Sequence, residues 1–158
     1  MEATLAKTSK AAAAAGRYLS FSLENEEYGL EILKVREIIG LMEITRVPRM
    51  PEFVRGVINL RGKVIPVVDL RLKFGLERAE DTDQTCIIVV DLGGVQMGMT
   101  VDNVLEVLAI GKDEIEESPS FGVGINTDFI LGIGKTKGRV VMLLDISQVL
   151  VEEAAELI

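Results

Sequence analysis

Residues 53–70 read FVRGVINLRGKVIPVVDL, and residues 129–146 read FILGIGKTKGRVVMLLDI. The two stretches align without a gap, 76 positions apart, and share one Phe, two Gly and one Asp at matching places. A second correspondence, at an offset of 69, matches Gly29, Ile32, Val35 and Glu37 to Gly98, Val101, Val104 and Glu106. This duplication predicts two similar small barrels or sheets side by side, with a crease between them in which a partner could dock.

Each copy of the motif predicts a β-hairpin. In the first copy, residues 56–60 and 63–70 have strand-like apolar patterns, and Arg61-Gly62 provides a tight turn. Pro66 cannot donate a backbone hydrogen bond, so we expect it at a sheet edge or a bulge.

The chain between and before the motifs adds more short strands. Residues 18–32 and 86–101 alternate around a polar or glycine turn and predict two further hairpins, whereas the spacing of Val35 and Ile38 predicts a helical turn over residues 33–39. Many short strands with closely spaced turns favour a mainly β fold of two small barrels over a parallel α/β sheet.

Short helices are expected after both motif copies, because Asp69 and Asp145 can accept hydrogen bonds from the free amides of a first helical turn. The second helix has apolar residues at helical spacing and is predicted to end within residues 151–158. At the other end, residues 1–16 are small and polar and predict a flexible tail.

The folded part is predicted to span residues 17–150. It consists of linear copies at about 17–76 and 84–150, and five charged residues within 77–83 indicate a linker between them. A chain of 158 residues with 48 % apolar residues can fill such a core.

Composition excludes several classes of function. The apolar runs are far shorter than the ~20 residues of a transmembrane helix, and the single cysteine, Cys86, has no intrachain partner, so we expect a cytoplasmic protein. A net charge of −8 argues against nucleic-acid binding. The chain has no His, the commonest general base and metal ligand, so we expect no enzyme, no metal and no cofactor.

Charged turn residues are the best candidates for recognition. Arg61, with Lys63 beyond Gly62, stands at a predicted hairpin tip, and Lys137 occupies the matching place in the second copy. Arg is favoured in protein recognition for its rigid fork of donors, although a solvated turn charge is an equally valid interpretation. Glu37 and Glu106 likewise need no role beyond solvation.

Other motifs point to no chemistry. The acidic residues at 113–117 lack the ligand order of an EF-hand, and the glycines at 122–124 and 132–134 lack the remainder of a nucleotide-binding motif. For Asp69, helix capping explains the residue better than phosphate acceptance. Val35, Ile38, Val104 and Val107 are core candidates, but part of this apolar seam can stay open as a helix-binding groove.

The segment GVINLRGKVIPVVDLR at residues 56–71 resembles the hallmark of the CheW-like family of bacterial chemotaxis adaptors, and EYGLEILKVREI at 27–38 resembles its upstream motif. The resemblance runs from about Tyr18 to Leu150. It implies two five-stranded β-barrels, SH3-like or OB-like, with strands exchanged between them. Spatial subdomains then need not coincide with the linear copies.

The resemblance also implies a non-catalytic scaffold that couples transmembrane chemoreceptors to the histidine kinase CheA and is recruited to membrane-associated receptor arrays. A groove receives the receptor's cytoplasmic hairpin tip, and one barrel end meets the kinase's regulatory domain, for which no residue is assigned. The same module occurs in CheA and CheV, but the stand-alone adaptor fits this chain. Carried over by motif position, the receptor-side candidates are Val35, Glu37, Gly56, Asn59, Arg61 and Val107.

Two other functions stay open at this point. An enzyme or small-ligand binder on a double barrel would need catalytic groups converging from both copies, which the absence of His disfavours. An oligonucleotide-binding barrel would need a basic surface, which the net charge of −8 disfavours.

Overall fold

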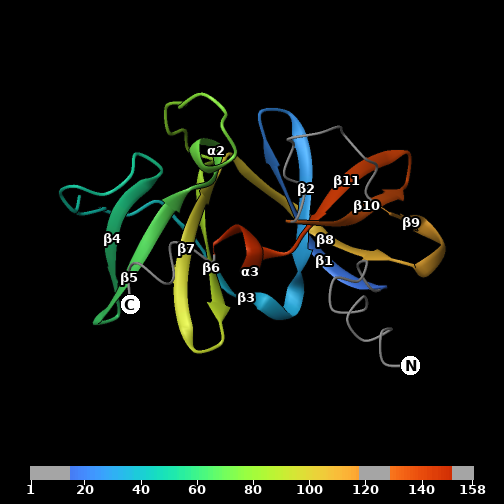
Figure 1. Cartoon of the computed structure of the whole chain (residues 1–158), viewed down its shortest axis with the longest axis horizontal. Coiled ribbons are helices and arrows are strands. Elements are labelled where there is room, and N and C mark those ends of the chain that lie inside the picture. The colour runs from blue at the N-terminus through green and yellow to red at the C-terminus, as the bar shows by residue number, and fades with distance from the viewer. Residues whose placement is uncertain (1–14, 118–128, 151–158) are drawn as a thin grey trace.

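The computed structural model describes residues 15–117 and 129–150. The predicted tail, except for residues 15 and 16, the predicted helix end at 151–158 and the glycines at 122–124 lie outside the described residues. The described part consists of two sheets and a few short helices, which confirms the predicted mainly β class. Figure 1 shows the sheets side by side, with the short helix α3 between them.

The five-stranded sheet has the order β3 (Val35–Gly40), β6 (Cys86–Leu92), β7 (Val95–Val101), β5 (Lys63–Asp69) and β4 (Val54–Leu60). The six-stranded sheet has the order β8 (Asn103–Ile110), β1 (Gly16–Leu23), β2 (Glu26–Glu31), β11 (Arg139–Leu144), β10 (Ile130–Thr136) and β9 (Ile115–Glu116). Neighbouring strands are antiparallel, except that β7 is parallel to β5 and β2 is parallel to β11.

The two linear copies exchange strands. The β1–β2 hairpin of the first copy pairs with β8 and β11 of the second, and the β6–β7 hairpin of the second pairs with β3 and β5 of the first. The predicted exchange is therefore confirmed, and neither sheet is made from one copy alone.

The two sequence offsets have one structural origin. Gly29 on β2 lies opposite Leu143 on β11, and Gly98 on β7 lies opposite Val67 on β5. The two glycines are 69 positions apart, and their partners Val67 and Leu143 are 76 positions apart. Each parallel pair therefore combines one segment of the 69-residue repeat with one segment of the 76-residue repeat. The duplication thus preserves pairing and register as well as strand order.

The helices are short. They are the 3₁₀ helices η1 (Ile32–Lys34) and η2 (Lys112–Glu114) and the α-helices α2 (Leu70–Lys73) and α3 (Ile146–Val149). Both predicted caps are confirmed, because the Asp69 side chain accepts from Leu72 N at 3.3 Å and the Asp145 side chain accepts from Ser147 N at 3.1 Å.

Three sequence expectations need comment. The helical turn predicted over 33–39 is wrong beyond Lys34, because residues 35–40 form β3 and pair with β6. Pro66 lies on β5, which has β4 on one side and β7 on the other. Only the residues of β5 after Pro66 pair with β7, so Pro66 itself has a strand on one side only, as at a sheet edge. The stretch 77–83 joins α2 to β6, two elements that both belong to the five-stranded side.

The core has three parts. A central cluster contains residues of both sheets, and a smaller cluster lies in each sheet. On β6, Ile88 and Val90 belong to the central cluster while Ile87 and Val89 belong to that of the five-stranded sheet, so both faces of this strand are buried. Each fully buried Ile or Val stabilises the fold by about 1.5–3 kcal/mol, so the shared cluster binds the two halves firmly together.

Candidate functional site

The turn between β4 and β5 presents an arginine in a fixed backbone conformation. Arg61 has a φ of 53° and Gly62 a φ of 86°, the positive values of a two-residue hairpin turn. The Asn59 side-chain oxygen accepts a hydrogen bond from Gly62 N at 2.8 Å. Asn59 thus holds the turn from within, and the Arg61 side chain remains 70 % exposed.

Glu37 orients that arginine. The Arg61 guanidinium donates to the Glu37 carboxylate, whose side chain is 31 % exposed. Glu37 lies on β3 and Arg61 follows β4, and these are the two outer strands of the five-stranded sheet. The ion pair therefore joins opposite edges of the sheet. It brings together Glu37, Asn59 and Arg61, three of the six receptor-side candidates.

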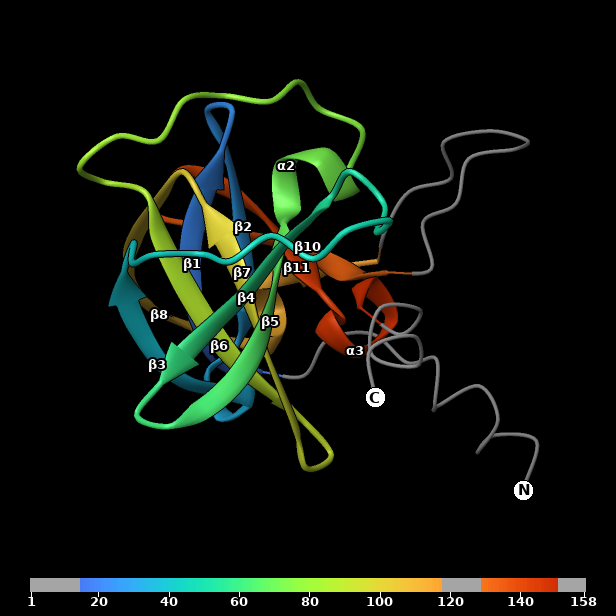
Figure 2. The same ribbon diagram turned by 90° about the vertical axis from the view of Figure 1, so that its left-hand side faces the viewer.

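Gly56 supports this hairpin from its other end. It is buried, has a φ of 142°, and lies where the backbone of the segment before β4 crosses the strand. Thr45 exchanges two backbone hydrogen bonds of 2.9 Å with Val57, and Figure 2 shows residues 41–53 running across the front of the five-stranded sheet. Gly56 therefore has a structural part in this region besides its predicted place at the receptor side.

The apolar seam is partly open. Val35 and Val104 are half-buried and pack against the central cluster, whereas Ile38 and Val107 are 42 % and 49 % exposed. Val107 lies on β8, opposite Leu19 in the six-stranded sheet, so it does not join the Arg61 group within one sheet. Ile38 is its counterpart at the 69-residue offset and lies beside Glu37.

Leu33 is an exposed residue that the sequence interpretation missed. It lies on η1, where the chain passes from the six-stranded to the five-stranded sheet, and it is 93 % exposed. It lines a cleft of about 790 Å³ whose walls come from both sheets, including Tyr18, Glu31, Arg36 and Asp91. The sequence contained one signal for this exposed position, because the residue that matches Leu33 at the 69-residue offset is the polar Asp102.

In the second copy, the equivalent charged residues have different partners. Arg139 donates to Glu106 at 2.9 Å and to Glu27 at 2.8 Å, and the Ser20 hydroxyl donates to the same Glu27 carboxylate. The hydrogen bonds that Arg139 donates, first to Glu106 and then to Glu27, raise the pKa of Arg139 above its usual range. Glu106, the counterpart of Glu37, is thus neutralised by a strand residue, and the exposed arginine tip belongs to the first copy.

Within 15–117 and 129–150, no group of three or more Cys, Asp and Glu side chains is placed to hold a metal ion. Asp69 is 7 % exposed and caps α2. No helix in these ranges is long and apolar enough to cross a membrane. The arrangement presents charged and apolar groups on rigid strands, as a binding surface does.

The chain is similar to known proteins over most of its length. The model of the CheW-like domain matches residues 17–154. A Chemotaxis protein CheW of Klebsiella aerogenes is 39 % identical over 89 % of this chain and 85 % of its own length. One of Bacillus subtilis is 35 % identical over 89 % and 90 %. The crystal structure of the scaffolding protein TtCheW from Thermoanaerobacter tengcongensis superposes with a TM-score of 0.76 at 39 % identity, covering 83 % of this chain and 89 % of that one.

Proposed function

The chain belongs to the CheW-like domain family, and from this premise we propose that it is a non-catalytic chemotaxis adaptor that couples chemoreceptors to a CheA-type histidine kinase. Its partners are the cytoplasmic hairpin tip of the receptors and the regulatory domain of the kinase. It works in the cytoplasm at membrane-associated receptor arrays.

One observation carries the receptor side of this proposal. Arg61 is exposed yet fixed, because the turn sets its backbone, Asn59 holds the turn and Glu37 orients the guanidinium. A preorganised arginine loses little conformational entropy when it binds a partner. Val35, Gly56 and Val107 complete the proposed receptor side, and the exposed Ile38 and Leu33 extend it.

The mechanism is geometric. The sheets share the central cluster, so a partner bound at one sheet is held at a fixed spacing from a partner bound at the other. Control of the kinase then requires only that the adaptor favour one of two kinase states over the other. The coupling free energy for such an effect is commonly ~1–3 kcal/mol. No covalent step is needed.

The first prediction concerns Arg61→Ala, which should weaken binding to a receptor cytoplasmic fragment about tenfold or more, equivalent to about 1.4 kcal/mol or more. Lys137→Ala is a matched control, because Lys137 has nearly the same φ, 54°, at the equivalent turn. Co-sedimentation of each folded variant with the receptor fragment and a CheA-type kinase measures the effect. Equal affinities for wild type and Arg61→Ala would remove Arg61 from the site, and failure of wild type to form the ternary complex would refute the adaptor function.

A further inference from the structure

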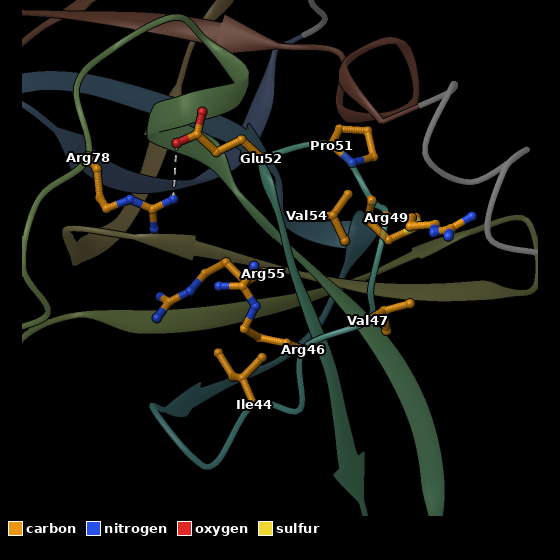
Figure 3. Close-up of a pocket in the computed structure, with 10 residues that line it drawn as sticks. Ile44, Arg46, Val47, Arg49, Pro51, Glu52, Val54, Arg55 and Arg78 are labelled. Atoms are coloured by element: carbon orange, nitrogen blue, oxygen red, sulfur yellow. Dashed lines mark hydrogen bonds and ion pairs between the residues drawn. The ribbon is translucent and has the colours of Figure 1, made fainter.

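A pocket on the five-stranded side gathers positive charge. It is lined by four arginines from three segments: Arg46 and Arg49 precede β4, Arg55 lies on β4, and Arg78 follows α2. Figure 3 shows Arg46, Arg55 and Arg78 gathered on one side of β4, with Arg49 extending away from them. In a chain of net charge −8, four arginines around one pocket need an explanation.

Two of the arginines are neutralised and two are not. Arg55 makes a forked pair with Asp81, at 3.2 and 3.0 Å, and Arg78 lies 3.5 Å from Glu52. In the part of the chain that the structure describes, Arg46 and Arg49 are exposed and have no hydrogen-bond or ion-pair partner. Four positive and two negative side chains leave a local charge of about +2 against the sign of the whole molecule.

Screening makes this local charge effective. Charges farther than the Debye length of about 8 Å are largely screened at physiological ionic strength. A ligand in the pocket therefore experiences the arginines more strongly than the distant carboxylates. The pocket favours an anion at short range even though the molecule repels anions at long range.

Apolar residues share the pocket. Ile44, Val47, Met50, Pro51 and Val54 complete its lining. Its volume of about 220 Å³ lies below the ~300–1,000 Å³ of small-molecule sites. Such a space accepts a few protein side chains and suits acidic groups flanking an apolar one.

The second copy lacks this pocket's central charge, because the counterpart of Arg55 at the 76-residue offset is Leu131. The pocket is also separate from the Arg61 turn. Arg55 lies near the start of β4 and Arg61 follows its end, and the five steps of strand from Arg55 to Leu60 extend about 16 Å at ~3.3 Å per residue. It therefore represents an addition to the first copy.

We propose that this arginine pocket, defined by Arg46, Arg49, Arg55 and Arg78, binds an acidic segment of a partner protein, with glutamate or aspartate side chains on the arginines and an apolar side chain against the Ile44–Val54 lining. The surface is distinct from the proposed receptor contact at Arg61. It gives the protein a second, salt-sensitive point of attachment.

Fluorescence anisotropy with the full chain tests the proposal. The probe is a fluorescein-labelled peptide in which two Glu-Glu pairs flank a leucine, and its matched control has Gln in place of each Glu. We expect wild type to bind the Glu peptide and not the Gln peptide, with affinity falling as salt rises. The double variant Arg46→Gln/Arg49→Gln should bind about tenfold more weakly, equivalent to about 1.4 kcal/mol. These arginines are exposed, so circular dichroism should show an unchanged fold.

Two further variants define the outcome. Lys112→Gln removes one positive charge from η2 and should leave peptide affinity unchanged, and Arg61→Ala should do the same. Equal affinity of wild type and the double variant, or equal affinity for both peptides, would overturn the proposal. Displacement of the probe by inorganic phosphate as effectively as by unlabelled Glu peptide would also overturn it, in favour of a small-oxyanion site.

Discussion

At the scale of single residues, the two copies of the motif differ in the side chains that surround the hairpin turn. The first copy carries Asn59 and Arg61 around its turn, and the second carries Lys135 and Lys137. Lys135 cannot accept the hydrogen bond that Asn59 accepts, and it pairs with Glu116 at 2.6 Å instead. A shared backbone therefore supports two chemically different tips.

Gly56 shows the opposite constraint, because its surroundings admit no side chain. A Cβ atom there would lie 2.0 Å from the Thr45 carbonyl oxygen, and the φ of 142° is strained for any other residue. The predicted effect of Gly56→Ala is a loss of about 2–4 kcal/mol in the free energy of unfolding.

Urea denaturation of Gly56→Ala and Gly40→Ala measures this effect. Gly40 is a matched control on β3, because its added Cβ would meet nothing within 4 Å and its φ is not in the positive range. We expect Gly40→Ala to change stability by less than about 0.5 kcal/mol. A Gly56→Ala protein as stable as wild type would show that the Thr45 crossing can move aside.

At the scale of elements, Gly29 on β2 and Gly98 on β7, the equivalent glycines of the two parallel pairs, lie close to side chains of neighbouring strands. A Cβ at Gly98 would lie 2.8 Å from Ile87 Cγ2, a methyl fixed at a branched Cβ. A Cβ at Gly29 would lie 3.2 Å from Val141 Cγ1 and 3.3 Å from Leu143 Cδ2, the end of a more flexible side chain. The equivalent positions thus differ in how much space the neighbours can give.

This difference predicts an order of stability. Gly98→Ala should destabilise the protein by about 1–3 kcal/mol, the usual cost of overpacking, and Gly29→Ala by less. Thermal and urea unfolding of both variants provide the measurement. The reverse order would show that β6 shifts more readily than β11.

The sequence could predict the elements whose conformation is specified locally, but not those that depend on distant segments. The hairpins β6–β7 and β4–β5 were predictable, because Gly93-Gly94 and Arg61-Gly62 specify turns locally. Strand β3 was not, because its conformation depends on pairing with β6, about fifty positions away. The arginine pocket gave no signal, because Arg46, Arg55 and Arg78 meet only through the crossing of the segment before β4. The sequence predicts Glu37 and Arg61 at one site, but it does not predict their ion pair, because this contact requires the two edges of the sheet to meet.

At the scale of the whole molecule, Asp102 secures one passage of the chain between the sheets. It lies between β7 and β8, and its carboxylate accepts from Arg71 Nε and Nη2, both at 2.8 Å, and from Glu24 N at 2.9 Å. Burial alone would raise the pKa of Asp102, but these hydrogen bonds hold it below its usual range. The contact joins α2, the β1–β2 turn and the passage at one point.

Asp102→Asn should therefore lower the free energy of unfolding by about 1–2 kcal/mol at neutral pH. Because the folded-state pKa is depressed, the carboxylate's contribution is complete above the unfolded pKa of about 3.9 and disappears as pH falls through the folded value. The difference between wild type and variant should be constant near neutrality and shrink in acid.

Unfolding measured across pH for wild type, Asp102→Asn and Asp83→Asn checks this prediction. Asp83 is an exposed residue of the segment between α2 and β6, so its substitution should have little effect on the free energy of unfolding at any pH. A wild-type to Asp102→Asn difference that grows as pH falls below 4 would contradict the assigned sign.

Strand exchange has a consequence for chain continuity. A break within residues 77–85 would leave two fragments, each holding some strands of both sheets and all the strands of neither. Neither fragment could complete a sheet alone. The strand pairing that is intramolecular in the intact chain would become an association between two molecules. Native structure would then depend on the concentration of both fragments.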